Sequence, residues 1–268
     1  MGLGAGLVGG VVLLALLATY LFGGRDEKSP AASTSTTASS APPVTLAGVA
    51  PVPPGRSITG ETPCPKADGS EARASKFEKA PPMCIDPAKT YTAVLATSAG
   101  TVKVKLDTAK TPATANNFVV LARFHYYDGS SFQRTDPSIE IIQGGSPNTQ
   151  SIADKGPGYT IKDEPAFTND TAAGGLKGPY KYTEGDLVMA RSQGPDSASA
   201  QYFFSAGPQT KSLEAQGTYV VFGQTTEGLD VLKKVLGSHV DCPPGSEACL
   251  GGAPRPPVTV TTISIEES

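Results

Sequence analysis

Alternating apolar and polar residues begin at Tyr91 and mark the start of a β-rich region. The chain alternates over 92–96 and again over 101–106, on either side of a Ser-Ala-Gly turn, which predicts a β-hairpin. Shorter apolar runs between glycine-rich turns predict further strands at 139–143, 159–163, 187–191, 202–205, 219–223 and 258–265. Many short strands at similar spacing are typical of a β-barrel or a β-sandwich.

Helical periodicity interrupts these strands in two places. A threonine and a proline at 111–112 form a helix-start signal, and the apolar face that includes Phe118 predicts a helix over residues 112–124. A second helix is expected over 227–236, with Thr226 as its cap. Its inward-facing residues are Leu229, Val231, Leu232 and Val235. So few helices among so many strands favour a closed β-barrel, because closure leaves no exposed sheet edge.

The first 24 residues carry no charge and are mostly apolar. As a helix, this stretch is long enough to cross a hydrocarbon core of about 30 Å, which predicts a membrane anchor over residues 1–24. A cleaved signal peptide is the alternative, although no basic residue precedes the apolar run and no good cleavage site follows it. The missing basic flank leaves the orientation of the span open.

The residues after the apolar stretch have a composition that does not support a hydrophobic core. Ala, Ser, Thr and Pro dominate residues 31–54, so we expect a disordered linker over 25–62 that holds a folded domain away from the membrane. A cysteine-containing extension follows at 63–90, and the folded domain occupies 91–268. We therefore expect a single-pass protein of the cell membrane whose folded domain is extracytoplasmic.

Four cysteines lie in two loop-like settings beside Pro and Gly. They are Cys64 and Cys84 in the extension, and Cys242 and Cys249 near the end of the chain. An even number favours disulfides and an extracytoplasmic location, and four cysteines allow three pairings. The local pairing, 64 with 84 and 242 with 249, is favoured because it closes short loops and needs no distant geometry. Neither spacing matches that of a zinc site, so no metal is expected.

The charges and reactive side chains argue against several functional classes. A net charge of −3 argues against a nucleic-acid partner. His125 ends the first predicted helix and His239 lies beside a cysteine loop, so both are interpreted as structural. No serine lies in a nucleophile-elbow setting, and the acidic residues, such as Asp163 and Glu164, are scattered on predicted turns and interpreted as solvated surface. The sequence therefore predicts neither a hydrolase nor a metalloenzyme.

One ordered set of motifs carries more information than any single residue in it. The runs are FQR at 132–134, QGG at 143–145, LVMAR at 187–191 and AQYFF at 200–204. Together with the hairpin and the helices, they make residues 91–268 resemble the cyclophilin family of peptidyl-prolyl cis-trans isomerases. The resemblance implies a mainly β fold, a closed eight-stranded cyclophilin-like β-barrel capped by two α-helices. It also implies catalysis of rotation about X-Pro bonds.

The resemblance also implies an active site, position by position. Arg134 matches the arginine that faces the prolyl nitrogen, and Gln143 matches the glutamine beside it, so these two are the predicted catalytic residues. Phe203 matches the phenylalanine that forms the floor of the proline pocket. The other predicted substrate-binding residues are Ile141, Ala190, Gln201, Leu213 and Tyr219. No cofactor is implied, since rotation about the amide bond breaks no covalent bond.

Several positions depart from the family pattern. Arg191 stands in place of an asparagine, and Tyr219 in place of a histidine. The family's pocket phenylalanine falls on Ile139 or Glu140, so the identity of one apolar wall stays open. Ser212 stands where the family often has a tryptophan, so we expect cyclosporin-type binding to be weak.

The leading interpretation is a membrane-tethered prolyl isomerase that binds proline-containing polypeptides and assists the folding of exported proteins. The alternative is a non-catalytic module of the same fold that binds Pro-containing segments, and the altered pocket near Glu140 and Arg191 keeps it open. Measuring isomerisation of a short X-Pro peptide separates these two interpretations.

Overall fold

The structure is a computed structural model that describes residues 49–170, 175–192, 194–243 and 249–268. The predicted anchor at 1–24, and the predicted linker as far as residue 48, lie outside the described residues. Within the described ranges, no helix is long and apolar enough to cross a membrane. All of the described residues belong to one unit, Pro42–Ser268.

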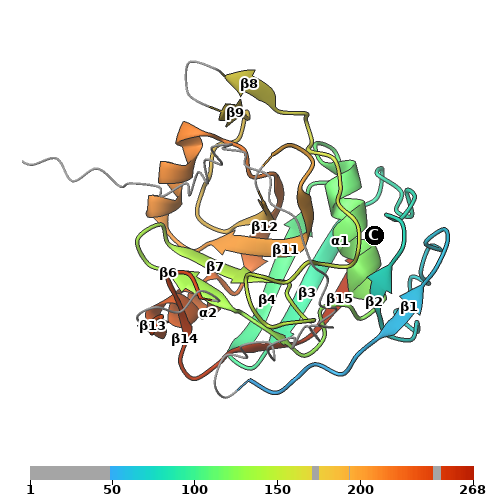
Figure 1. The fold of residues 1–268 in the computed structure, drawn as a ribbon, viewed down its shortest axis with the longest axis horizontal. Helices are drawn as coiled ribbons and strands as arrows, with labels where there is room; N and C mark the ends of the chain where they lie inside the picture. Colours follow the sequence, from blue (N-terminus) through green and yellow to red (C-terminus); the bar gives the residue numbers. More distant parts are fainter. Residues whose placement is uncertain (1–48, 171–174, 193, 244–248) are drawn as a thin grey trace, which may run out of the picture. The chain divides into compact units, whose positions relative to one another are not determined.

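Eleven strands of the described chain form one curled sheet (Figure 1). Neighbouring strands follow the order β13-β14-β6-β7-β11-β10-β12-β4-β3-β15-β5. In chain order, they are β3 (Tyr91–Thr97), β4 (Gly100–Leu106), β5 (Ser130–Ser131), β6 (Arg134–Asp136), β7 (Ile141–Gly144), β10 (Asp186–Arg191), β11 (Ala198–Ser205), β12 (Val221–Glu227), β13 (His239–Asp241), β14 (Gly252–Pro254) and β15 (Thr259–Glu267). The prediction of a mainly β fold is confirmed.

The predicted number of eight strands is wrong, and two features of the main sheet cause the difference. Only Phe132 and Gln133 separate β5 from β6, so one bent strand is divided into two segments. Phe132 is buried at this break, where its ring packs edge-on against Phe204. The second feature is a hairpin of β13 and β14, which continues the sheet beyond β6. Because β5 and β6 lie near opposite ends of the strand order, their two-residue connection curls the sheet back on itself.

The predicted hairpin forms as β3 and β4, and the predicted closing strand forms as β15. Side chains of the hairpin alternate between core and solvent, and Leu95, Val102 and Val104 are buried. β15 pairs antiparallel along β3, from Val260 opposite Thr97 onward. The period-two pattern of the sequence therefore predicted correctly which face of these strands is buried.

Two small sheets accompany the main sheet among the described residues. One consists of β1 (Arg56–Ile58) and β2 (Ala74–Phe77), and the other of β8 (Thr168–Asp170) and β9 (Gly175–Lys177). β1 falls within 25–62, which the composition predicted to be a linker throughout. This short strand is ordered because it pairs with β2 and packs Ile58 against the core.

Residues 159–163 do not form the predicted strand. They make only an isolated bridge, between Ile161 and Ala198. A side-chain contact holds this segment instead of a ladder of main-chain hydrogen bonds, since the Tyr159 hydroxyl donates to Asn117 Oδ1 at 2.7 Å. The apolar run correctly indicated that this segment packs against the core, but the predicted strand pairing is wrong.

The two carboxylates interpreted as solvated surface have structural roles instead. Asp163 is buried, and it exchanges backbone-to-carboxylate hydrogen bonds with Asp196 at 2.8 and 2.9 Å. Burial raises the pKa of the Asp163 carboxyl, although the hydrogen bond from Asp196 opposes this effect. Glu164 accepts hydrogen bonds from the backbone N–H groups of Ala113 and Thr114 at 3.0 and 2.7 Å. It therefore caps the first helix from a distant loop.

Both predicted helices are present, as α1 (Pro112–Arg123) and α2 (Leu229–Gly237), together with an unpredicted 3₁₀ helix, η1 (Pro208–Ala215). The first predicted cap lies where expected, because Thr111 is the N-cap residue of α1, although its side chain makes no capping hydrogen bond. The second predicted cap is wrong, because α2 begins beyond Thr226. α2 starts later than predicted because β12 runs further along the chain. Gly228 then precedes the helix with a φ of 87°, a left-handed conformation that suits glycine.

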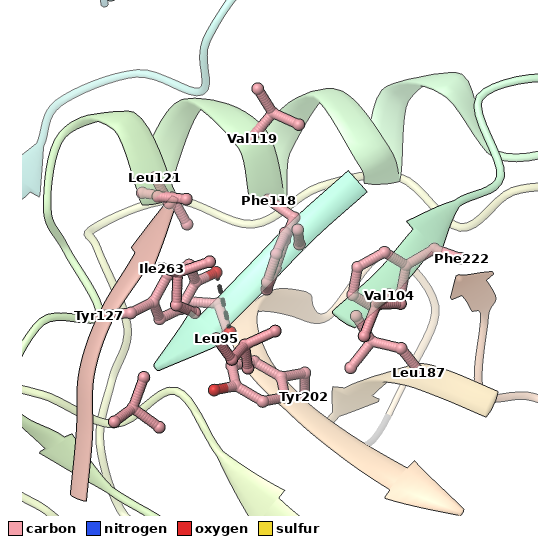
Figure 2. Packing of buried hydrophobic residues seen from close by; sticks show 14 of the residues in the cluster. Leu95, Val104, Phe118, Val119, Leu121, Tyr127, Leu187, Tyr202, Phe222 and Ile263 are labelled. Carbon is pink, nitrogen blue, oxygen red and sulfur yellow. Dashed lines mark hydrogen bonds between the residues drawn. The ribbon is translucent and has the colours of Figure 1, made fainter. Parts of the chain in front are cut away.

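Phe118 anchors α1 to the curled sheet (Figure 2). Its buried ring packs against the rings of Tyr127, Tyr202 and Phe222, at centroid distances of 5.1, 5.6 and 5.3 Å. Burying a phenylalanine side chain contributes about 1.5–3 kcal/mol, and aromatic pairing adds to that. Tyr202 belongs to β11, so this aromatic cluster ties the helix to a strand that carries predicted site residues.

Arg73 fastens the extension to the main domain. Its Nη1 donates to the carbonyl oxygens of His125 and Asp128 at 2.8 and 2.7 Å, and its Nη2 donates to that of Tyr126 at 2.9 Å. The His125 ring lies at the same junction, with one nitrogen 2.8 Å from Asp128 Oδ2 and the other 2.8 Å from the carbonyl oxygen of Gly69. His125 is therefore structural, as predicted.

The predicted local disulfides are both present. Cys64 is bonded to Cys84, and Cys242 to Cys249. The first bond is also tied to α1, because Asn116 Oδ1 accepts a hydrogen bond from the backbone N–H of Cys84 at 2.7 Å. The extension is thus fixed both within itself and to the main domain.

Replacing Arg73 should destabilise the fold strongly. We expect Arg73→Ala to lower the free energy of unfolding by about 2–4 kcal/mol, because three main-chain carbonyls lose a charged donor. Arg73→Lys should recover only part of this loss, since an ammonium group lacks the planar fork. Urea unfolding followed by circular dichroism measures both effects. Lys79→Ala, which removes an exposed cation of the same extension, is the control and should leave the midpoint unchanged. An unchanged midpoint in Arg73→Ala would contradict the anchoring role.

Candidate active site

All eight predicted catalytic and substrate-binding residues line one cavity of about 620 Å³. They are Arg134, Ile141, Gln143, Ala190, Gln201, Phe203, Leu213 and Tyr219. The structure thus brings together residues that are spread over more than eighty positions of the sequence. Their individual roles remain predictions from the resemblance.

Strand register brings five of these residues to the same face of the sheet. Arg134 on β6 pairs with Gln143 on β7, and Gln143 pairs with Phe203 on β11. Side chains that are directly opposite on neighbouring strands lie about 5 Å apart at Cβ. Ile141 and Gln201 lie two residues along β7 and β11, so they point to the same side of the sheet.

A register shift gives β10 a wider share of the cavity wall. The pairing of β10 with β11 shifts between Met189 and Arg191. Such an irregularity changes the direction of the side chains beside it. Both Ala190 and Arg191 consequently line the cavity, together with Leu213 from η1 and Tyr219 from the segment before β12.

A chain of amide hydrogen bonds leads away from the arginine. Arg134 Nη1 donates to Gln143 Oε1 at 3.3 Å, and Gln143 Nε2 donates to Gln201 Oε1 at 2.9 Å. Gln201 Nε2 in turn donates to the carbonyl oxygen of Asp154 at 3.1 Å. Gln133 donates weakly to the same Gln201 Oε1, at 3.4 Å. Each amide has its orientation fixed by the next one, so the guanidinium faces a rigid polar wall.

Asp136 holds the second terminal nitrogen of the Arg134 guanidinium, the one that Gln143 does not contact. Its Oδ2 lies 2.8 Å from Arg134 Nη2, and the two side chains are only 18% and 15% exposed. Burial raises the pKa of the Asp136 carboxyl, but hydrogen bonds from Ser138 and Arg134, together with the arginine charge, outweigh burial and lower the pKa below its usual value. The ion pair therefore stays intact at neutral pH. Arg134 Nε has no hydrogen-bond partner among the described residues.

Apolar side chains form the floor of the cavity. Phe203 and Ile141 are buried and pack with Tyr182 and Val188 in a separate small core. The Tyr219 ring meets the Phe203 ring edge-on, with their centroids 5.5 Å apart. This surface suits a small apolar ring, such as that of proline.

The structure assigns Ile139 to the wall that the sequence left open. Ile139 lines the cavity and packs against the same small core. Glu140 does not line the cavity, because its carboxylate accepts a hydrogen bond from the backbone N–H of Gln209 at 2.6 Å. The Glu140 carboxylate therefore points away from the pocket, and Ile139 gives the pocket an apolar wall here.

Several cavity residues were missed by the sequence analysis. They are Ile152, Asp154, Lys155, Thr160, Ser192, Ser197, Ser199 and Leu250. Most belong to irregular segments around 152–160 and 192–197, where no periodic pattern indicates which side chains point inward. Leu250 follows directly after the second disulfide and carries no motif.

Neither histidine takes part in the cavity. His125 lies at the junction with the extension, and His239 Nδ1 lies 2.8 Å from Thr135 Oγ1. In the part of the chain that the structure describes, no group of His, Cys, Asp or Glu side chains is arranged to hold a metal ion. The described wall offers the Arg134 guanidinium, which Asp136 and Gln143 fix, together with side-chain amides and apolar rings. Further charged side chains line it at positions 154, 155 and 191.

Comparisons with known proteins agree with this fold. Residues 92–264 match the family model of the cyclophilin type peptidyl-prolyl cis-trans isomerases. A peptidyl-prolyl cis-trans isomerase of Acinetobacter baylyi is 31% identical over 173 residues, which cover 63% of this chain and 82% of that protein. Peptidyl-prolyl cis-trans isomerase B of Escherichia coli is 31% identical over 179 residues, 64% of this chain and 97% of that protein. An isomerase of Streptomyces antibioticus is 32% identical over 181 residues, 65% of this chain and 98% of that protein.

The curled sheet, the capping helices and the cavity that Arg134 lines define a cyclophilin-type domain. The chain belongs to the cyclophilin family, and its enzyme class is that of the peptidyl-prolyl cis-trans isomerases.

The pH dependence of turnover should reflect Asp136. Its folded-state pKa lies below the ordinary value of 3.8, so its ionic contact with Arg134 is present above that value and is lost as the pH falls through the lowered one. We expect kcat/KM to be flat from about pH 5 to 8, since no histidine lines the cavity. Asp136→Asn should lower kcat/KM about three- to tenfold across this range, because the guanidinium loses its charged partner. A stopped-flow peptide assay, with circular dichroism at each pH, tests this. A bell-shaped profile centred near pH 6.5 would contradict it.

Proposed function

We propose that this chain accelerates cis–trans isomerisation of X-Pro bonds in exported polypeptides, with Arg134 as the catalytic residue. The observation that carries the proposal is the position of Arg134. Asp136 and Gln143 fix its guanidinium in the wall of a cavity whose floor is the Phe203 ring. A bound proline ring would occupy the apolar floor and leave its nitrogen toward the guanidinium.

The barrier to this reaction comes from conjugation of the amide. Rotation about the C–N bond costs about 18–20 kcal/mol, because the nitrogen lone pair is delocalised into the carbonyl group. In the twisted transition state the lone pair is localised on nitrogen, where it accepts a hydrogen bond from Arg134. That bond is weak in the planar ground state, so the interaction favours the transition state selectively. Gln143 lines the cavity with an amide that can bind the main chain of the substrate, and Gln201 fixes the orientation of that amide.

Arginine suits this role better than lysine would. Its charge is permanent, and its donors lie in a rigid plane that Asp136 and Gln143 already orient. The partly buried position lowers the effective dielectric constant and strengthens the hydrogen bond to the substrate. No group has to gain or lose a proton during rotation.

Removal of Arg134 should slow the reaction with little effect on affinity. A charge-assisted hydrogen bond contributes about 1.5–3 kcal/mol, so we expect Arg134→Ala to lower kcat about ten- to a hundredfold. Arg134→Lys should rescue poorly, because a flexible ammonium does not reproduce the fork. A protease-coupled or nuclear magnetic resonance exchange assay on an X-Pro peptide measures the rate, and calorimetry measures peptide affinity.

The control for these variants is Lys76→Ala, which removes an exposed cation on β2 and should leave the rate unchanged. Thermal unfolding of each variant shows whether it is folded. A folded Arg134→Ala protein that isomerises the peptide at the wild-type rate would remove Arg134 from the mechanism.

The alternative of a non-catalytic binding module receives little support from the cavity. It depended on charges near Glu140 and Arg191. Glu140 lies outside the cavity lining, and the Arg191 guanidinium stacks over the Phe167 ring at 5.4 Å. Neither charge interrupts the chain of hydrogen bonds from Arg134 to Gln201.

We also propose an extracytoplasmic location with a tether to the membrane. Two disulfides support an oxidising compartment, because such bonds persist where thiols are not kept reduced. The apolar sequence at 1–24 and the Ala-, Ser-, Thr- and Pro-rich stretch that follows support an anchor and a tether. In this location the enzyme would act on polypeptides that fold after export.

Fractionation of cells tests the tether. We expect the full-length protein in the membrane fraction, resistant to extraction by high salt and released by detergent. Proteolysis within 31–48 should release an active domain, because this stretch has the composition of a linker and the first strand, β1, begins only at Arg56. Full-length protein of unchanged mass in the soluble fraction after gentle lysis would contradict the anchor, and a shorter soluble form would favour a cleaved signal peptide.

Weak cyclosporin binding also belongs to the proposal. Ser212 is exposed, and its hydroxyl donates to the carbonyl oxygen of Gln209 at 2.9 Å within η1. It offers neither the apolar area nor the N–H donor of a tryptophan indole.

A further inference from the structure

A hairpin outside the family motifs borders the catalytic cavity. β13 and β14 pair with each other, and β14 joins the main sheet where Gly252 lies opposite Thr135 of β6 (Figure 1). β6 is the strand that carries Arg134. The hairpin therefore extends the sheet next to the catalytic strand.

Close contacts fix the hairpin against β6. Thr135 Oγ1 lies 2.8 Å from His239 Nδ1, at the start of β13. A Cβ on Gly251, whose φ is 73°, would lie 2.9 Å from the carbonyl oxygen of Thr135, and a Cβ on Gly252 would lie 2.2 Å from that of Val240. Neither position has room for a side chain. The backbone at 251–252 therefore packs directly against the backbones of β6 and β13.

A disulfide fixes the other end of the hairpin. Cys242 and Cys249 are bonded, and the backbone N–H of Cys242 donates to the carbonyl oxygen of Gly251 at 3.0 Å. Leu250 lies directly between the bonded Cys249 and the tightly packed Gly251. Its backbone is therefore held on both sides.

Leu250 is exposed at the rim of the cavity. It lines the same cavity as Arg134 and Phe203, yet 52% of its surface is accessible. The described chain exposes two other large apolar side chains to this extent, Met83 and Val240, and neither lines the cavity. An apolar side chain that lines the catalytic cavity, on a backbone held at both sides, is placed to meet the bound polypeptide.

We propose that Leu250 is a specificity-determining residue, which contacts a large apolar side chain of the substrate polypeptide close to the isomerised proline. This inference rests on the proposed function. An extended chain advances about 3.3 Å per residue, so a polypeptide with its proline over Phe203 leaves the cavity within a few residues. The enzyme then favours X-Pro bonds with a leucine-sized neighbour over those with only small polar neighbours. The disulfide keeps Leu250 at the rim before substrate arrives, which reduces the entropy lost on binding.

The test measures turnover of two series of peptides by the full-length protein. In one series a single leucine is moved from three positions before the proline to three positions after it, and in the other series serine replaces that leucine. Wild-type enzyme should prefer leucine over serine at one position or two adjacent positions, which identifies the side of the proline that meets Leu250. Leu250→Ala should lower this leucine-to-serine ratio of kcat/KM about five- to tenfold.

The effect of Leu250→Ala on kcat/KM should come from a change in KM. Leu250 touches no reacting atom, so it contributes equally to ground-state and transition-state binding and leaves kcat unchanged. If Leu250 merely supports β6, and through it Arg134, Leu250→Ala will lower kcat by the same factor on every peptide, and the inference is wrong.

Val240→Ala is the matched control. Val240 is an aliphatic residue of the same hairpin and is 51% exposed, but it does not line the cavity, so the ratio should stay at the wild-type value. The double variant Cys242→Ser/Cys249→Ser, checked by thermal unfolding, should lower the ratio at least twofold, because Leu250 is no longer held at the rim. An unchanged ratio in that variant would overturn the role of the disulfide.

Remaining outcomes separate this inference from the proposed function. Wild-type enzyme that turns over neither series would contradict the proposed function itself. Wild-type enzyme that turns over both series with no leucine preference at any position would contradict the inference alone. A Leu250→Ala variant with an unchanged ratio, but with altered light scattering or weaker binding to phospholipid vesicles, would assign Leu250 to a second copy of the chain or to a membrane surface.

Discussion

The ladder between β6, β7 and β11 is the constraint on which the active site depends. It sets Arg134 opposite Gln143 and Gln143 opposite Phe203, so a cation, an amide and an aromatic floor lie on three successive strands. A slip of one residue in either pairing would turn these side chains to the other face of the sheet. The amide chain from Gln143 to Gln201 adds a second constraint on the same pairing, because its 2.9 Å hydrogen bond spans β7 and β11.

Other parts of the molecule contribute by keeping this ladder in place. Phe118 packs α1 against Tyr202 of β11, so the strand that carries Gln201 and Phe203 is supported from the core side. Glu164 caps α1 from a loop fifty residues further along the chain. The Arg73 contacts hold the extension at the opposite end of α1. Aromatic packing, a carboxylate cap and a guanidinium clamp thus act on one helix that backs the site.

The sequence predicted the features that depend on local pattern. Hairpin β3–β4 and helix α1 appear within about one residue of their predicted bounds, because alternation and a Thr-Pro start are local signals. Prediction from the sequence failed where a distant residue determines the role of a side chain. Glu164 is an example, because its capping role depends on a helix far away in the sequence. The eight site residues came from ordered motifs and not from periodicity. Leu250 and the 152–160 segment carried no motif, and only the three-dimensional structure places them at the cavity.

The chemistry of the reaction explains why the motifs mark the centre of the cavity and not its rim. Bond rotation needs no proton transfer and no nucleophile, so catalysis depends on the placement of one guanidinium over an apolar floor. The reaction therefore constrains the groups at the centre of the cavity and does not involve the side chains at its rim. Choice among substrates must then come from side chains that the reaction does not use, since one hydrogen bond to a prolyl nitrogen is the same for every X-Pro bond. In this chain the rim includes a disulfide-closed hairpin beside the catalytic strand. Its rigidity matters more than its area, because a side chain held in place loses less entropy when the substrate binds.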